Sequence, residues 1–117
     1  LICPGGMPGA KNLGDCTALV QWIQKHFDKG GYVAAICAAP ALVLSKIKMD
    51  GKRQMTCYPG FEEYLPDAHM QPHGVVVDGN LITGRGPAYA FKFGLAILEQ
   101  LTSKKVAEEV AAGMLLD

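Results

Sequence analysis

The stretch YVAAICAAPALVL, residues 32–44, decides the fold, because an apolar strand-forming run ends at Cys37 and an apolar helical pattern begins directly after it. A side chain at such a tight strand-to-helix junction projects from the carboxyl end of the strand, among the free N–H groups of the new helix. Those donors and the positive end of the helix favour a thiolate. The small side chains of Ala38 and Ala39 allow close backbone approach, and Pro40 suits a first helical turn. Cys37 is therefore the candidate nucleophile.

A second interpretation of Cys37 stays open at this point. Free cysteine is among the most frequently buried residue types, and an inert core thiol needs no chemistry. Such a residue normally lies within one face of a strand or helix, whereas Cys37 falls at the break between two periodicities. Its position favours a reactive thiol, although a cysteine without its histidine is only a candidate nucleophile.

The regions on either side of this stretch alternate between helical and strand patterns. The strand over residues 32–36 carries few polar side chains, which is typical of a strand covered by helices on both faces. We therefore predict an α/β domain with a mostly parallel sheet. The expected elements are a helix over 13–29 that stops at Gly30-Gly31, a helix from 38 to about 46, a strand over 54–58, a hairpin of 75–77 and 81–83, a helix over 88–101, and a helix over 104–110 capped by Ser103.

Several segments that follow predicted strands are expected at one edge of the sheet. They contain Gly5 and Gly6, Cys37, Tyr58 and Arg85. In an open α/β sheet, ligands bind outside the carboxyl ends of the strands. The strand that ends at Tyr58 is expected to neighbour the strand that ends at Cys37, which would bring the phenol near the thiol. We therefore predict one site at this edge, with Gly5, Tyr58 and Arg85 in contact with the substrate.

Composition argues against several classes of function. The 11 basic and 11 acidic residues give a formal net charge of zero and the basic residues are scattered, so no surface for nucleic acid is expected. No apolar run is long enough to cross a bilayer. The four cysteines form no C-x-x-C pair, and nearby prolines argue against a helical metal site at His69 and His73. We expect no metal, no cofactor and no membrane, and free thiols in a reducing cytoplasm.

Three motifs, in this order, resemble the signatures of the ThiJ/PfpI superfamily: LICPGG at residues 1–6, AAICAAP at 34–40 and TGRGP at 83–87. The similarity extends to AEEV at 107–110. Within the superfamily, the chain is most similar to the branch of the parkinsonism-associated protein deglycase and its bacterial relatives. This resemblance implies a flavodoxin-like three-layer α/β sandwich with a mostly parallel sheet, and a homodimer.

The resemblance also assigns roles at the predicted site. Cys37 falls on the family's conserved cysteine, and the backbone N–H groups of Gly6 and Ala38 fall on its oxyanion donors. The family's acidic partner of the cysteine lies nearer the N-terminus, and LICPGG resembles the end of a strand that enters a loop. We therefore expect residues 1–117 to be the C-terminal portion of a single domain, with exposed apolar surface. A missing N-terminal fragment would complete the sheet and supply the acid.

Two positions depart from the family pattern. Ala38 stands where the peptidase branch has a histidine, so a Cys-His dyad of adjacent residues is not available and peptidase activity is not expected. Tyr58 stands where the deglycase branch often has a histidine, and a phenol donates a hydrogen bond but is a poor base near neutral pH. The motif PGFEE at 59–63 imitates the one that carries the family's acid but follows the cysteine, so Glu62 and Glu63 are not assigned that role.

Two functions of different classes follow from these observations. The first is a cofactor-free enzyme, glyoxalase III-like or a protein deglycase, in which Cys37 adds to an aldehyde such as methylglyoxal, or to its adduct on a glycated protein, and lactate is released. The second is a non-enzymatic oxidative-stress sensor or chaperone that acts through oxidation of Cys37. A role linked to thiamine or thiazole phosphate, as in some relatives, is weaker because no P-loop motif is present.

Overall fold

A four-stranded sheet forms the centre of the computed structural model, which describes residues 1–116. The strand order is β1-β2-β6-β5, with β1 at Ile2–Cys3, β2 at Val33–Ile36, β6 at Leu81–Gly84 and β5 at Val75–Asp78. Strands β1 and β6 both run parallel to β2, whereas β5 runs antiparallel to β6. The predicted hairpin and the mostly parallel sheet are therefore confirmed.

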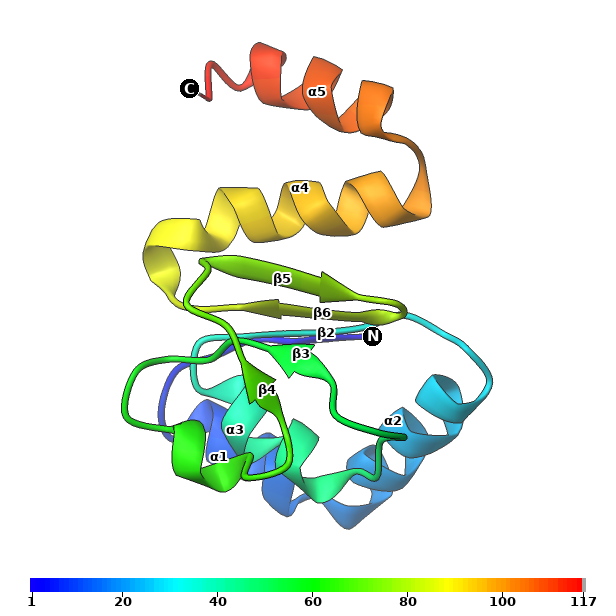
Figure 1. Cartoon of the computed structure of the whole chain (residues 1–117), viewed down its shortest axis with the longest axis vertical. Coiled ribbons are helices and arrows are strands. Elements are labelled where there is room, and N and C mark those ends of the chain that lie inside the picture. Colours follow the sequence, from blue (N-terminus) through cyan, green and yellow to red (C-terminus); the bar gives the residue numbers. More distant parts are fainter. Residues whose placement is uncertain (117) are drawn as a thin grey trace.

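Helices cover both faces of this sheet (Figure 1). On one face lie α1 (Gly9–Asp15), α2 (Thr17–Asp28), α3 (Ala39–Leu42) and the 3₁₀ turn η1 (Leu44–Lys46). On the other face lies α4 (Ala90–Leu101), which follows the 3₁₀ turn η3 (Pro87–Tyr89), and α5 (Lys104–Gly113) packs against α4. The three layers of the predicted sandwich are present.

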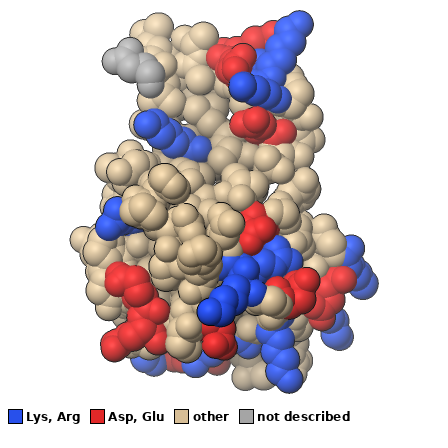
Figure 2. Space-filling view, in the orientation of Figure 1, with Lys and Arg blue, Asp and Glu red and all other residues tan. Residues whose placement is uncertain are grey.

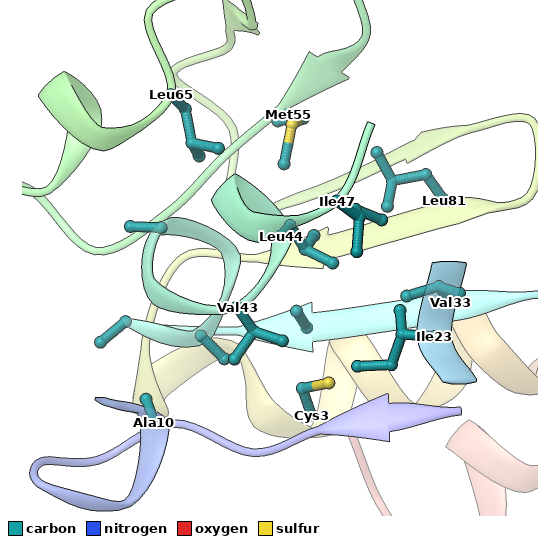
Figure 3. Close-up of a cluster of buried hydrophobic side chains, with 14 of the residues drawn as sticks. Cys3, Ala10, Ile23, Val33, Val43, Leu44, Ile47, Met55, Leu65 and Leu81 are labelled. Carbon is teal, nitrogen blue, oxygen red and sulfur yellow. The ribbon is translucent and has the colours of Figure 1, made fainter. Parts of the chain in front are cut away.

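The hydrophobic core is divided between the two faces of the sheet. Val33 and Ala35 of β2 belong to the larger cluster, whereas Ala34 packs with Ile82 and Phe93 on the α4 side. This alternation follows from the two-residue repeat of a strand. Figure 3 shows the larger cluster, in which buried side chains of helices and strands fill the space beside the sheet. Because β2 is buried on both faces, its carboxyl end has a fixed position in the molecule.

The region before β2 contains two helices rather than the single helix predicted over residues 13–29. Helix α1 begins at Gly9, before the predicted start at residue 13, and Cys16 separates α1 from α2 with extended backbone (φ −83°, ψ 96°). Gly14 lies so close to α3 that an added Cβ would be 2.0 Å from the carbonyl oxygen of Leu42. Helix α1 therefore packs closely on α3, a contact that helical spacing in the sequence does not reveal.

The predicted strand over residues 54–58 is shorter than expected and lies outside the main sheet. Only β3 (Gln54–Met55) is a strand, and it pairs in parallel with β4 (His69–Met70) in a separate two-stranded sheet. Strand β4 lies in a region for which no strand was predicted, and the 3₁₀ turn η2 (Glu62–Tyr64) precedes it. The prediction that residues 54–58 neighbour β2 in the sheet is therefore wrong.

Side-chain acceptors of the hairpin hold this segment in its observed place. The N–H of Gln54 donates to the Asp78 carboxylate (2.8 Å), and the N–H of Thr56 donates to Oγ1 of Thr83 (3.0 Å). A strand inside the main sheet would instead donate to backbone carbonyls of a neighbouring strand. Residues 54–56 therefore lie against the β5–β6 hairpin and do not extend the sheet.

Other boundaries agree with the sequence or differ by a few residues. Helix α3 ends at Leu42 and the chain continues as the 3₁₀ turn η1, so the helix predicted to reach about residue 46 is shorter. Ser103 caps α5 as predicted, since its Oγ accepts a hydrogen bond from the N–H of Val106 (3.1 Å). Helix α4 ends at Leu101, as expected.

The surface exposes several large apolar side chains, which was expected. Ile2 on β1 is 59% exposed and Trp22 on α2 is 62% exposed. Within residues 1–116, β1 pairs with β2 along one edge only. On the face shown in Figure 2, acidic and basic side chains are intermixed. Among the described residues, no helix is both long and apolar enough to span a membrane.

Candidate functional site

The strand-to-helix junction after β2 is a sharp turn at Cys37, as the sequence indicated. Cys37 has φ 66°, a left-handed conformation that residues other than glycine rarely adopt. Its N–H donates to the carbonyl of Gly84 at the end of β6 (2.8 Å), and its own carbonyl accepts from the N–H of Tyr58 (2.8 Å). Hydrogen bonds to two neighbouring segments therefore hold the strained residue, whose side chain is partly exposed.

The loop after β1 lies against this turn. A Cβ added to Gly5 would be 2.6 Å from Cβ and 3.4 Å from Sγ of Cys37, so only glycine leaves room for the thiol-bearing residue. Gly6 follows with φ 86°, in the left-handed region that favours glycine. Within the described part of the chain, neither the N–H of Gly6 nor that of Ala38 donates a hydrogen bond. Both N–H groups are therefore without an acceptor among residues 1–116.

Tyr58 and Arg85 line one small pocket beside the turn. This pocket has a volume of about 280 Å³ and is lined by Tyr58, Pro59 and residues 85–89. The Tyr58 side chain is 44% exposed. Nη1 of Arg85 donates to the carbonyl of Pro72 (3.3 Å). Residues 54–58 do not pair with β2. Tyr58 nevertheless lies at the predicted edge of the sheet, because its N–H donates to the carbonyl of Cys37.

Cys57 belongs to this region, although the sequence analysis did not single it out. Its side chain is buried, and burial raises the pKa of its thiol from 9.0 to about 11, with a further increase from the negative charge of Glu62. The Arg85 guanidinium opposes the increase, whereas Cys37 adds to it. Cys57 therefore lies within electrostatic range of both groups, yet stays protonated near neutral pH. Its place directly before Tyr58 was the signal in the sequence.

The other candidate ligands do not gather at the turn. All four cysteines are free, with Cys16 exposed and Cys3 buried, and burial raises the pKa of the Cys3 thiol. His69 and His73 are both exposed, and His69 lies on β4 rather than in a loop. No group of three potential metal ligands lies together in the part of the chain that the structure describes.

Two further features lie outside the predicted site. The Glu62 carboxylate accepts hydrogen bonds from the N–H of Gly60 (2.6 and 3.2 Å), so it closes its own turn. A larger cavity of about 400 Å³ is lined by residues of η1, β3 and the segment 64–68, and it includes none of the predicted site residues. The predicted site residues Cys37 and Arg85, by contrast, directly follow the carboxyl ends of β2 and β6.

The three layers and the cysteine turn define a flavodoxin-like α/β sandwich with a nucleophile-type elbow at the end of a central strand. The chain belongs to the DJ-1/PfpI family, whose family model matches residues 1–100. The family expected from the three sequence motifs and the fold that it implies are thus confirmed.

Named relatives and solved structures that are similar to this chain also belong to DJ-1 proteins. The chain is 37% identical over 118 residues to Protein dj-1beta of Drosophila melanogaster, a match that covers 99% of this chain and 63% of the relative. The crystal structure of Drosophila melanogaster DJ-1beta is similar with a TM-score of 0.91 and 36% identity, over 99% of this chain and 63% of that one. The structure of Toxoplasma gondii DJ-1, oxidized, is similar with a TM-score of 0.88 and 35% identity, over 96% of this chain and 61% of that one. The chain spans less than two thirds of the length of these relatives.

Proposed function

We propose that the protein is a cofactor-free, cysteine-dependent enzyme that acts on reactive carbonyl compounds, either methylglyoxal itself or its adducts on proteins. The observation that carries this proposal is the arrangement at Cys37. A partly exposed thiol lies on a strained turn, with Gly5 in contact. Among residues 1–116, the N–H groups of Gly6 and Ala38 have no other acceptor. Such preorganised donors stabilise the oxyanion that forms when a thiolate adds to a carbonyl.

The proposed reaction needs only water as a second reactant. The sulfur of Cys37 forms a C–S bond with the aldehyde carbon, and the carbonyl electron pair moves to oxygen, where Gly6 and Ala38 hold it. A proton then moves from the sulfur-bearing carbon to the neighbouring ketone carbon, which leaves a thioester. Water cleaves the C–S bond, releases lactate and restores the thiol. By resemblance, the acid that moves the proton belongs to a more N-terminal portion of the domain, and the Tyr58 hydroxyl donates a hydrogen bond to the substrate.

An assay of lactate formation from methylglyoxal tests this function in the full-length protein. Cys37→Ala is expected to abolish turnover, whereas Cys16→Ala, which removes an exposed thiol elsewhere, should leave it unchanged. Tyr58→Phe is expected to lower turnover modestly without affecting folding, because it removes a hydrogen-bond donor and keeps the ring. Equal activity in wild type and Cys37→Ala would exclude the mechanism.

An oxidative-stress sensor or chaperone is the second candidate, and two observations favour it. A relative of similar fold, Toxoplasma gondii DJ-1, has a structure described as oxidized. In this chain Cys37 is partly exposed, whereas Cys3 and Cys57 are buried and burial raises the pKa of both. Mild peroxide should therefore give a sulfinate at Cys37 before Cys3 and Cys57, read by mass spectrometry. Preferential oxidation of another cysteine would remove this candidate.

The oligomeric state is a separate part of the proposal. The resemblance implies a homodimer, and the exposed apolar side chains Ile2 and Trp22 offer contact area for a partner or for another part of the domain. Light scattering coupled to size exclusion on the full-length protein measures the mass directly. A monomer at micromolar concentration would contradict the homodimer.

A further inference from the structure

The pocket beside the elbow carries a charged group without a counter-ion. Tyr58, Pro59 and residues 85–89 form its wall, and Arg85 is the charged residue among them. Within residues 1–116, the Arg85 guanidinium has no carboxylate within 4.0 Å. Nη1 donates to the carbonyl of Pro72 (3.3 Å), so the other N–H donors of the planar group remain for a ligand. The pocket is therefore suited to an anion.

This pocket adjoins the thiol and does not enclose it. Cys37 is not part of its wall, but its carbonyl accepts from the N–H of Tyr58 and its N–H donates to Gly84, the residue before Arg85, both at 2.8 Å. The elbow and the pocket wall are therefore joined through the backbone of Tyr58 and of Gly84. The volume of about 280 Å³ lies at the small end of ligand pockets, which suits a short chain rather than a large ring system.

Resting on the proposed carbonyl chemistry, we propose that this pocket selects 1,2-dicarbonyl substrates that carry a carboxylate, which Arg85 binds while the aldehyde carbon reaches Cys37. A guanidinium matches a carboxylate through two parallel N–H···O bonds, which gives both charge and direction. Tyr58 and Tyr89, whose phenol groups can donate hydrogen bonds, belong to the same wall. A suitable probe is 4,5-dioxopentanoate, in which a two-carbon spacer separates the dicarbonyl from the carboxylate.

The reaction of this probe balances with water alone. Sulfur bonds to the aldehyde carbon, a proton moves from that carbon to the adjacent ketone carbon, and the resulting thioester is hydrolysed. The aldehyde carbon is oxidised to a carboxylate and the ketone carbon is reduced to an alcohol within one molecule. The product is 2-hydroxypentanedioate, and the carboxylate held by Arg85 takes no part in bond making.

The first test compares kcat/KM for 4,5-dioxopentanoate with kcat/KM for its methyl ester in the full-length protein. Wild type should prefer the anion, and Arg85→Gln should lower the anion-to-ester ratio by about ten- to a hundredfold, as expected for loss of a charged hydrogen-bonding partner. Arg85→Lys keeps the charge but not the planar set of donors, so its anion-to-ester ratio should lie between those of wild type and Arg85→Gln. Lys105→Gln, which removes an exposed charge from α5, should leave both values unchanged. An unchanged ratio in Arg85→Gln overturns the proposal.

A second test does not depend on turnover and separates failure of this proposal from failure of the proposed function. Glutarate, which is unreactive, should slow the alkylation of Cys37 by iodoacetamide, and its dimethyl ester should not. Protection that disappears in Arg85→Gln supports the anion pocket even if no substrate is turned over, in which case only the enzyme proposal fails. Equal protection by glutarate and its diester refutes the anion pocket even if methylglyoxal is converted.

Discussion

Alkylation by iodoacetamide is expected to show that the fold suppresses the reactivity of Cys57 by about two orders of magnitude. Burial and the charge of Glu62 raise the pKa of this thiol from 9.0 to about 11. At pH 8 that change lowers the thiolate fraction from about 9% to about 0.1%, and only the thiolate reacts. Cys57 should therefore react about a hundredfold more slowly in the folded protein than in the unfolded chain, and Cys37 should be the fastest of the four in the folded protein.

Isotope-coded alkylation followed by peptide mass spectrometry measures all four rates in one sample. Complete tryptic cleavage places Cys37 on the peptide 30–46 and Cys57 on the peptide 54–85, and the remaining two cysteines lie on separate peptides. Repeating the pulse in denaturant is the control, because there the four rates should converge. If Cys57 reacts equally fast in the folded and unfolded protein, the reasoning from burial is refuted.

The Cys57 thiol also makes the stability of the folded protein depend on pH in the alkaline range. Between pH 9 and 11 the unfolded chain has released the Cys57 proton, whereas the folded protein still holds it. The unfolded state then binds fewer protons, so the free energy of unfolding contributed by this group falls as pH rises through that window and is unaffected below it. Urea titrations of wild type and Cys57→Ser across the window isolate the contribution. A parallel pH dependence in both proteins would contradict the assigned shift.

Three substitutions test other parts of the argument. Thr83→Val should lower the free energy of unfolding in urea by about 1–3 kcal/mol, because it leaves the buried N–H of Thr56 without an acceptor. Thr83→Ser keeps the hydroxyl and should cost less. Equal losses in the two variants would show that the hydrogen bond is unimportant. Gly5→Ala should slow alkylation of Cys37, because the new Cβ would lie 2.6 Å from its Cβ, whereas Gly9→Ala, with open space around it, should not. Ser103→Ala should destabilise by roughly 1 kcal/mol through loss of the α5 cap, and Ser103→Asp should not.

Local patterns were sufficient where a few adjacent residues decide the structure. The change from strand to helical periodicity at Cys37, with Pro40 directly after it, placed the elbow without any knowledge of distant contacts. The segment Asp78-Gly79-Asn80 placed the hairpin turn, and Gly79 has the positive φ of 60° that such a turn requires. Ser103 marked the start of α5 through its own side chain.

The arrangement around the thiol depended on contacts that sequence periodicity does not contain. Gly14 of α1 packs against Leu42 of α3, and these two residues are far apart in the sequence. The Arg85 guanidinium lowers the pKa of the Cys57 thiol although the two residues come from separate loops. No pattern within its loop indicated that the Cys57 thiol would be buried there, although its neighbour Tyr58 and Arg85 were both predicted at this edge of the sheet. Such juxtapositions follow from packing rather than from local propensity.

The sequence by itself determined the class of fold, the cysteine elbow, the hairpin and the family, because each of these depends on periodicity or on a short motif within a few residues. Only the tertiary structure decided where residues 54–58 lie. Thr56 and Thr83, which are 27 positions apart, form the buried hydrogen bond that holds this segment against the hairpin. A strand-forming pattern indicates that backbone donors need acceptors, but it does not indicate which acceptors they find. Only the packing of the chain could therefore place Tyr58 beside Cys37 although their segments do not pair in the sheet.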